Sequence, residues 1–171
     1  MESCSARPRI SHQLWGRELA KILIVEDNAL NIKLFCDLLA AHGHEPKAVT
    51  DSRNAIEAAR ELSPDLVITD IQLPHVTGLD LIRLIRADDQ LAQVPIMAVT
   101  AYSARGDEER IRAAGAQAYV SKPISVMRFA QTVEQLLEHG HDGEAAAGED
   151  LENDVTDAPG PDEAGGEETS G

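Results

Sequence analysis

The stretch Lys21-Ile-Leu-Ile-Val-Glu-Asp-Asn28 decides the fold, because its apolar, largely β-branched run ends abruptly in two carboxylates. A continuous apolar run is typical of a strand that is buried on both faces of a parallel sheet. Comparable runs recur at residues 66–69, 96–99 and 118–120, and a weaker one lies near residues 47–49. Stretches with apolar residues at helical spacing separate these runs. The pattern predicts an α/β protein with five β/α units, which form a flavodoxin-like, doubly wound, five-stranded parallel sheet.

Three apolar stripes predict helices that cover this sheet. They consist of Leu30, Leu34, Phe35, Leu38 and Leu39; of Leu81, Ile82, Leu84 and Ile85; and of Val126, Phe129, Val133, Leu136 and Leu137. Another helix is expected to end near Leu62, with Asp51 or Ser52 as its N-terminal cap. The stretch 105–114 differs, because only Ile111 and the alanines can face inward. We therefore expect its helix to be loosely held.

The acidity of the chain is concentrated at its C-terminal end. The formal net charge is -15, from 15 Lys and Arg residues against 30 Asp and Glu residues. Residues 140–171 hold 11 acidic and no basic residues, so the 15 basic and 19 acidic residues elsewhere leave a net charge of -4. We expect one folded domain over residues 20–139, a flexible N-terminal extension over residues 1–19 and an acidic disordered tail over residues 140–171. No second folded domain is expected.

Composition also excludes several classes of partner. A net negative charge disfavours binding to nucleic acid, which needs clustered Lys and Arg. The two cysteines, Cys4 and Cys36, stand in no metal-binding spacing and suit a reducing compartment. No apolar run reaches the roughly 20 residues that span a bilayer. We therefore expect a cytoplasmic protein without nucleic-acid binding or membrane insertion.

Polar residues follow the apolar runs directly. Glu26 and Asp27 follow the run at residues 22–25, and Asp70 follows the run at residues 66–69. Thr100 follows the run at residues 96–99, and Lys122 lies just beyond the run at residues 118–120. Taken singly, Asp27 could cap a helix, Asp70 could form a turn and Lys122 could be a solvated lysine. The carboxyl ends of parallel strands share one edge, however, so these side chains should lie together. Three carboxylates at one edge repel one another and raise one another's pKa values unless a cation lies among them.

The chemistry of this edge predicts a metal-assisted phosphoryl site. Mg²⁺ prefers a few carboxylate ligands with positions left for water and a phosphate oxygen. The ammonium of Lys122 and the hydroxyl of Thr100 can bind the remaining phosphoryl oxygens. A nucleotide is disfavoured, because residues 25–29 lack the glycines of a phosphate-binding turn and the chain has no GxxxxGK[ST] loop. A haloacid-dehalogenase-type phosphatase is also disfavoured, since no second aspartate lies two residues after Asp70.

Separated motifs of the chain resemble the receiver domain of bacterial two-component response regulators. They are Lys21-Ile-Leu-Ile-Val-Glu-Asp-Asn28, Asp65-Leu-Val-Ile-Thr-Asp-Ile-Gln-Leu-Pro74, Gly78, Ile96-Met-Ala-Val-Thr-Ala101 and Ser121-Lys-Pro123. The segments 25–31, 70–74, 106–112 and 121–125 are more narrowly similar to the stand-alone cell-division regulators of that family. The resemblance spans residues 20–138 and implies the CheY-like form of the flavodoxin-like fold.

The resemblance also implies a role for each acceptor-site residue. Asp70 would accept a phosphoryl group from a phosphohistidine of a histidine kinase or a histidine phosphotransfer protein. Asp27, Asp70 and the backbone carbonyl of Gln72 would bind Mg²⁺, and Glu26 would contribute through a water molecule. Lys122 would neutralise the phosphoryl oxygens. In-line geometry and charge stabilisation suffice for this transfer, so no general base is expected.

Other residues would transmit the signal or control access to the phosphate. Thr100 would move toward the phosphate and let Tyr119 turn inward, although Tyr119 could equally be a half-buried aromatic residue of an edge strand. The Lys122–Pro123 peptide is expected to be cis; Pro123 could also begin a helix. The residues expected to govern phosphate access and lifetime are Gln72, Ala101 and Tyr102.

The expected output is a protein–protein interaction. Without an output domain, phosphorylation would act through a downstream partner that binds the face from Arg105 to Glu138 and prefers one of two conformations. The alternative is a phosphate sink or phosphorelay intermediate without a direct output. A pseudo-receiver scaffold is disfavoured, because every acceptor-site residue is present. We therefore expect a signalling phosphoacceptor, with self-catalysed phosphotransfer and slow autodephosphorylation, and not an enzyme.

Overall fold

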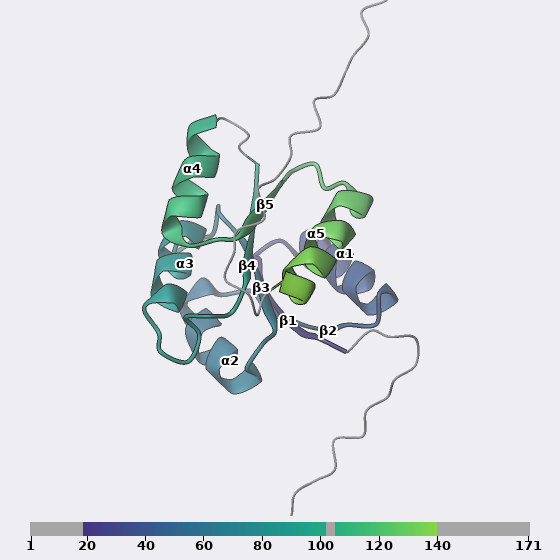
Figure 1. The fold of residues 1–171 in the computed structure, drawn as a ribbon, viewed down its shortest axis with the longest axis horizontal. Helices are drawn as coiled ribbons and strands as arrows, with labels where there is room; N and C mark the ends of the chain where they lie inside the picture. The colour runs from purple at the N-terminus through teal and green to yellow at the C-terminus, as the bar shows by residue number, and fades with distance from the viewer. Residues whose placement is uncertain (1–18, 102–104, 140–171) are drawn as a thin grey trace, which may run out of the picture.

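The computed structural model describes residues 19–101 and 105–139. Five parallel strands form one sheet in the order β2-β1-β3-β4-β5 (Figure 1). They are β1 (Lys21–Val25), β2 (Glu45–Val49), β3 (Leu66–Asp70), β4 (Ile96–Thr100) and β5 (Ala118–Ser121). The predicted doubly wound sheet is confirmed. The predicted N-terminal extension, apart from Leu19, and the predicted tail lie outside the described residues.

Helices cover both faces of the sheet. They are α1 (Ala29–Ala41), α2 (Ala55–Leu62), α3 (Gly78–Arg86), α4 (Arg105–Ala114) and α5 (Val126–His139), with a 3₁₀ turn η1 (Ser52–Asn54) before α2. Helices α1 and α5 lie on one face, and α2, α3 and α4 lie on the other (Figure 1). No helix of the described residues is both long enough and apolar enough to cross a membrane.

Alternation along each strand divides the core into two layers. In β1, Leu23 and Val25 pack beneath the α2–α3–α4 layer, while Ile22 and Ile24 pack beneath α1 and α5. In the second layer Phe35 of α1 stacks on a phenylalanine of α5, Phe129, with ring centroids 5.1 Å apart. Every residue of β3 and β4 is buried. This burial explains the continuous apolar runs of the central strands.

Polar residues fix where the helices begin. Asn28 caps α1, because its side chain accepts hydrogen bonds from two backbone N–H groups of the first turn. Thr77 caps α3, because its hydroxyl accepts a hydrogen bond from the backbone N–H of Asp80. Asp51, one of the two predicted caps, accepts a hydrogen bond from the backbone of Arg53 and so caps η1. The chain therefore enters α2 through a 3₁₀ turn, and the other predicted cap, Ser52, is buried.

The predicted apolar stripes are only partly buried. Leu30 is 79% exposed, Leu84 50% and Val126 47%. A helix touches the sheet along a narrower stripe than its apolar pattern suggests, and the first turns of α1 and α5 lie at the edge of the sheet. Among the described side chains of α4, Ile111 and Ala114 are buried as predicted, whereas Ala113 is exposed.

Candidate functional site

The carboxyl edge of the sheet brings Asp70 and Lys122 together. Asp70 is the last residue of β3, and Lys122 follows β5 directly. The backbone N–H of Lys122 donates to the carbonyl of Thr100 at 2.7 Å, which fixes its position beside β4. Its ammonium then donates a charge-assisted hydrogen bond to Oδ2 of Asp70. The carboxylate is 4% exposed and the lysine side chain 25%, so the pair is reached from solvent on the lysine side.

Glu26 forms the second part of this charge network. Its side chain is buried, and its Oε1 accepts a hydrogen bond from the backbone N–H of Asn28 at 3.0 Å. Its Oε2 accepts from Nδ2 of Asn31 at 3.1 Å and from the Lys122 ammonium at 3.5 Å. Burial raises the pKa of Glu26, the charge of Asp70 adds to this rise, and the hydrogen bond from Asn28 and the charge of Lys122 oppose it.

Asp27 is placed differently from the other two carboxylates. It follows Glu26 at the end of β1 and is exposed. Within residues 19–101 and 105–139, no three His, Cys, Asp or Glu side chains are already grouped as a metal site. The Lys122 ammonium is the cation between Glu26 and Asp70, because a lysine side chain can neutralise both, and Asp27 remains at the open rim.

The loop after β3 fixes the other oxygen of Asp70. The backbone N–H of Gln72 donates to Oδ1 of Asp70 at 2.8 Å. Gly78 opens α3 against this loop, and its N–H donates to the carbonyl of Ile71 at 3.0 Å. A Cβ atom on Gly78 would lie 2.1 Å from the backbone oxygen of Asp70. The site therefore requires a residue without a side chain at position 78.

A buried serine braces the same loop. The hydroxyl of Ser52 donates to the carbonyl of Pro74 at 2.7 Å and accepts from the N–H of Val76 at 3.1 Å. Ser52 is buried. It precedes α2 in the sequence, whereas the loop that it braces follows β3. One hydroxyl thus satisfies two backbone groups of the loop that carries Gln72.

Thr100 and its neighbours complete the edge. Thr100 ends β4 and is buried, and Ala101 follows it as an exposed small residue. Tyr102, predicted to influence phosphate lifetime, lies outside the described residues. The Lys122–Pro123 peptide is cis, as predicted. Because α5 begins only at Val126, Pro123 does not serve as the first residue of that helix.

Tyr119 of β5 lies against α4. It is partly buried, and its hydroxyl donates to Oε2 of Glu108 at 3.0 Å. Oε1 of Glu108 accepts from Nε of Arg112 at 3.0 Å. The hydrogen bond from Arg112 lowers the pKa of Glu108 most, and the one from Tyr119 lowers it further. Two side chains thus hold this carboxylate between β5 and α4.

The sequence reasoning missed Asn31, Ser52 and Glu108. The polar Asn31 interrupts the apolar stripe of α1 close to Glu26, and this interruption was a readable signal. The Glu108 to Arg112 spacing of four residues was also readable as a helical ion pair. Nothing local in the sequence connects Ser52 with Pro74, because their contact depends on how the loops pack.

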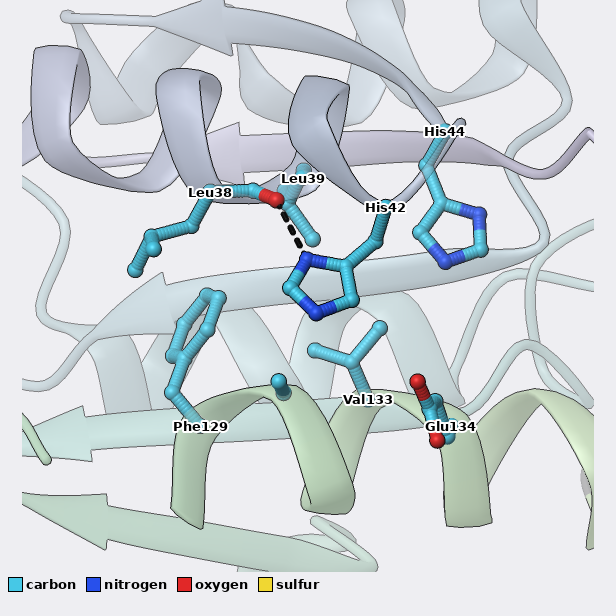
Figure 2. Close-up of a pocket in the computed structure, with 8 residues that line it drawn as sticks. Leu38, Leu39, His42, His44, Phe129, Val133 and Glu134 are labelled. Carbon is cyan, nitrogen blue, oxygen red and sulfur yellow. Dashed lines mark hydrogen bonds between the residues drawn. The ribbon is translucent and has the colours of Figure 1, made fainter. Parts of the chain in front are cut away.

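A pocket between α1 and α5 lies away from this edge (Figure 2). Its lining includes Leu38, His42, Phe129 and Val133. Nδ1 of His42 lies 2.7 Å from the carbonyl oxygen of Leu38, as the dashed line in Figure 2 marks. His42 follows the C-terminal end of α1, whereas Asn31 lies in its first turn. The pocket therefore takes no part in the acidic site.

This chain is similar to known proteins over most of its described residues. The family model described as the response regulator receiver domain matches residues 22–134. The polar-differentiation response regulator DivK of Brucella anthropi is 50% identical over 116 residues, which cover 68% of this chain and 94% of DivK. DivK of Brucella ovis is 49% identical over the same shares of both chains.

Solved structures show the same fold. The chemotaxis protein CheY4 of Vibrio cholerae aligns with a TM-score of 0.66 at 24% identity, covering 69% of this chain and 98% of CheY4. The receiver domain of sensor histidine kinase PA1611 from Pseudomonas aeruginosa has a magnesium ion coordinated in its active-site cleft. It aligns with a TM-score of 0.65 at 30% identity, covering 71% of this chain and 99% of that domain. The chain therefore belongs to the response regulator receiver domain family, whose members are phosphoacceptor signalling proteins and not classical enzymes.

Proposed function

We propose that Asp70 accepts a phosphoryl group from a phosphohistidine of a histidine kinase or a histidine phosphotransfer protein. The observation that carries this proposal is the pairing of the Asp70 carboxylate with the Lys122 ammonium at the carboxyl edge of the sheet. An oxygen of Asp70 forms the new P–O bond while the P–N bond breaks, and the imidazole nitrogen keeps the electron pair of that bond. The product is an acyl phosphate. The attacking carboxylate is already anionic, so no general base is required.

Before the transfer, the Lys122 ammonium contacts two carboxylates. After the transfer, it must also neutralise the phosphoryl group. It donates to Asp70 and lies 3.5 Å from Glu26 in the structure. A phosphoryl group on Asp70 adds negative charge and acceptor oxygens beside the same ammonium. Lys122 is therefore assigned to stabilise the transferred group, together with the hydroxyl of Thr100 at the end of the neighbouring strand.

The oxygen donors at this edge fit Mg²⁺. Carboxylates and carbonyls are the hard ligands that this ion prefers, and β1 and β3, which carry Asp27 and Asp70, are adjacent in the sheet. Asp27, Asp70 and the Gln72 carbonyl would hold the ion directly, and Glu26 would do so through water. When bound, the ion supplies positive charge to the phosphoryl oxygens and offsets the repulsion among the carboxylates.

The phosphohistidine donor would dock on an apolar rim beside the acceptor. Leu30 and Leu34 of α1 and Val126 and Met127 of α5 are exposed, with Leu30 and Met127 more than 70% exposed at 79% and 74%. Both helices begin at the carboxyl edge of the sheet, where Asp70 lies. An exposed apolar group bordering an acidic centre suits a protein partner that must bring its histidine to Asp70.

The downstream partner would recognise the face that includes α4, β5 and α5. Thr100 moves toward the phosphate and Tyr119 changes position, so the surface from Arg105 to Glu138 differs between the two states. Gln72, Ala101 and Tyr102 would set the access of water to the acyl phosphate. The 50% identity with the DivK polar-differentiation regulators supports a role in cell-cycle or division control.

The test is labelling by acetyl phosphate in the presence of Mg²⁺. The wild-type protein is expected to be labelled, the variant Asp70→Asn to remain unlabelled, and the control variant Asp89→Asn, which changes an exposed carboxylate, to be labelled normally. Labelling of Asp70→Asn at the wild-type rate would contradict the assignment. Capture of a partner by the beryllofluoride-treated protein alone supports the regulator. A short-lived acyl phosphate without such capture supports a phosphate sink or relay intermediate.

A further inference from the structure

Asn31 supplies the neutral side-chain donor in the hydrogen-bond network of Glu26. The Glu26 carboxylate is 1% exposed, so it depends on protein donors in place of water. Its Oε2 accepts from the Asn31 amide at 3.1 Å and lies 3.5 Å from the Lys122 ammonium. Two donors of different charge therefore share one oxygen atom.

The first turn of α1 holds Asn31 in this position. Asn28 Oδ1 accepts hydrogen bonds from the backbone N–H groups of Leu30 at 2.9 Å and Asn31 at 3.4 Å. The backbone N–H of Asn28 in turn donates to Oε1 of Glu26 at 3.0 Å. The helix cap and the amide thus bind both oxygens of the same carboxylate, which fixes its rotamer and its distance from Asp70.

The sharing of Oε2 affects Lys122. Two buried carboxylates, Glu26 and Asp70, compete for one ammonium, and that ammonium lies closer to Asp70. A neutral amide on Glu26 replaces part of the solvation that burial removes, without adding a charge. If the amide is lost, the remaining hydrogen-bond donor described at Oε2 of Glu26 is the Lys122 ammonium, and the carboxylate would draw it closer. The ammonium would then leave Asp70, and Glu26 would leave the orientation from which it can reach a metal-bound water.

We propose that Asn31 is a positioning residue for Mg²⁺-dependent phosphorylation of Asp70. It holds Glu26 toward the metal site and leaves Lys122 to Asp70. This inference rests on the proposed function, since it concerns the binding of Mg²⁺ at the same site. Residues that hydrogen-bond metal-binding groups commonly change metal affinity about 10-fold or more when they are replaced.

The test measures Mg²⁺ affinity directly, by calorimetry on the unphosphorylated full chain. Asn31→Leu keeps a similar side-chain volume without the amide, and we expect its affinity for Mg²⁺ to fall about 10-fold. Asn31→Ala should show the same loss, and Asn31→Gln, which keeps an amide, should recover part of it. Asn54→Leu is the matched control, because the Asn54 side chain makes no capping hydrogen bond at α2. The ¹⁵N resonance of the Lys122 ammonium should shift in Asn31→Leu and stay in place in Asn54→Leu.

The labelling rate separates positioning from general damage. Asn31 donates to Glu26, so saturating Mg²⁺ should restore much of the acetyl phosphate labelling of Asn31→Leu, and the remaining deficit should reflect the displaced Lys122 ammonium. Wild-type Mg²⁺ affinity in folded Asn31→Leu or Asn31→Ala would overturn the inference while leaving the proposed function intact. Failure of the wild-type protein to bind Mg²⁺ would overturn both.

Discussion

The hydroxyl of Tyr119 donates a hydrogen bond to the carboxylate of Glu108 at 3.0 Å, and this contact joins β5 to α4. Glu108 is held from its other side by Arg112, one turn along the same helix. Among the described side chains of α4, Ile111 and Ala114 are buried, so this bond adds to their packing in holding the helix. The contact therefore favours one conformation of the face from Arg105 to Glu138, to which we expect the downstream partner to bind.

Removing this contact should favour the phosphorylated conformation. A hydrogen bond is worth about 1 kcal/mol net, so Glu108→Ala or Tyr119→Phe should bind beryllofluoride with Mg²⁺ about fivefold more tightly, if the bond is lost on activation. Glu109→Ala, which changes the exposed neighbour, should leave this affinity unchanged. Fluorine NMR titration measures it. Equal affinities for all four proteins would mean that Tyr119 is a structural aromatic residue of the edge strand.

Gly78 should tolerate no side chain. A Cβ atom there would lie 2.1 Å from the backbone oxygen of Asp70, so Gly78→Ala must displace the loop after β3 or the start of α3. Such overpacking costs about 1–3 kcal/mol of unfolding free energy. Gly106→Ala is the control, because a Cβ atom at position 106 meets no other atom within 4 Å. Urea unfolding should show a loss for the first variant alone, and equal stabilities would argue against the close approach.

Ser52→Ala should weaken the loop beside the acceptor. The substitution removes the hydroxyl that donates to the Pro74 carbonyl and accepts from the Val76 N–H. The Val76 N–H still donates to the Pro74 carbonyl at 3.0 Å, so we expect a loss of about 1 kcal/mol of unfolding free energy in urea, the net worth of a hydrogen bond. Ser63→Ala, at an exposed serine after α2, is the comparison. Hydrogen exchange should become faster at Val76 in the first variant and remain unchanged in the second.

Asp88 should make the stability of the domain depend on pH in the acidic range. Hydrogen bonds from the Arg60 guanidinium lower the pKa of this carboxylate, and backbone N–H donors add to the effect. Because the folded pKa lies below the unfolded value, the contribution is complete above the unfolded pKa and disappears as the pH falls through the folded pKa. Asp88→Asn should therefore be less stable than the wild type near neutral pH, and the difference should shrink in acid.

The control for this pH dependence is Asp89→Asn, which alters the exposed neighbouring carboxylate. Thermal unfolding of the three proteins across the acidic range gives the comparison. A difference between wild type and Asp88→Asn that stayed constant through the titration range would show that the Arg60 contact does not depend on charge.

Much of the site could be predicted because its signals are local in the chain. The apolar runs marked the strands, and the residues after each run marked the edge, so Asp70, Thr100 and Lys122 were placed before any contact was known. The extent of burial was less predictable. Leu30 belongs to a good apolar stripe and is nevertheless 79% exposed, since periodicity gives the angle of a residue around a helix but not whether the sheet reaches that turn.

By itself, the sequence determined the parallel sheet, the order of its β/α units and the acidic composition of the acceptor edge. Each of these follows from the spacing of apolar residues, or from the polar residues that end a strand, and both patterns lie within a few neighbouring residues. The tertiary structure alone decided which groups meet. Lys122 lies between Glu26 and Asp70, Ser52 reaches a carbonyl 22 residues away, and Tyr119 finds Glu108 across two elements. These contacts depend on the rotation and offset of helices and loops packed against the sheet. Those variables are set by the packing of the whole core, and no local pattern encodes them.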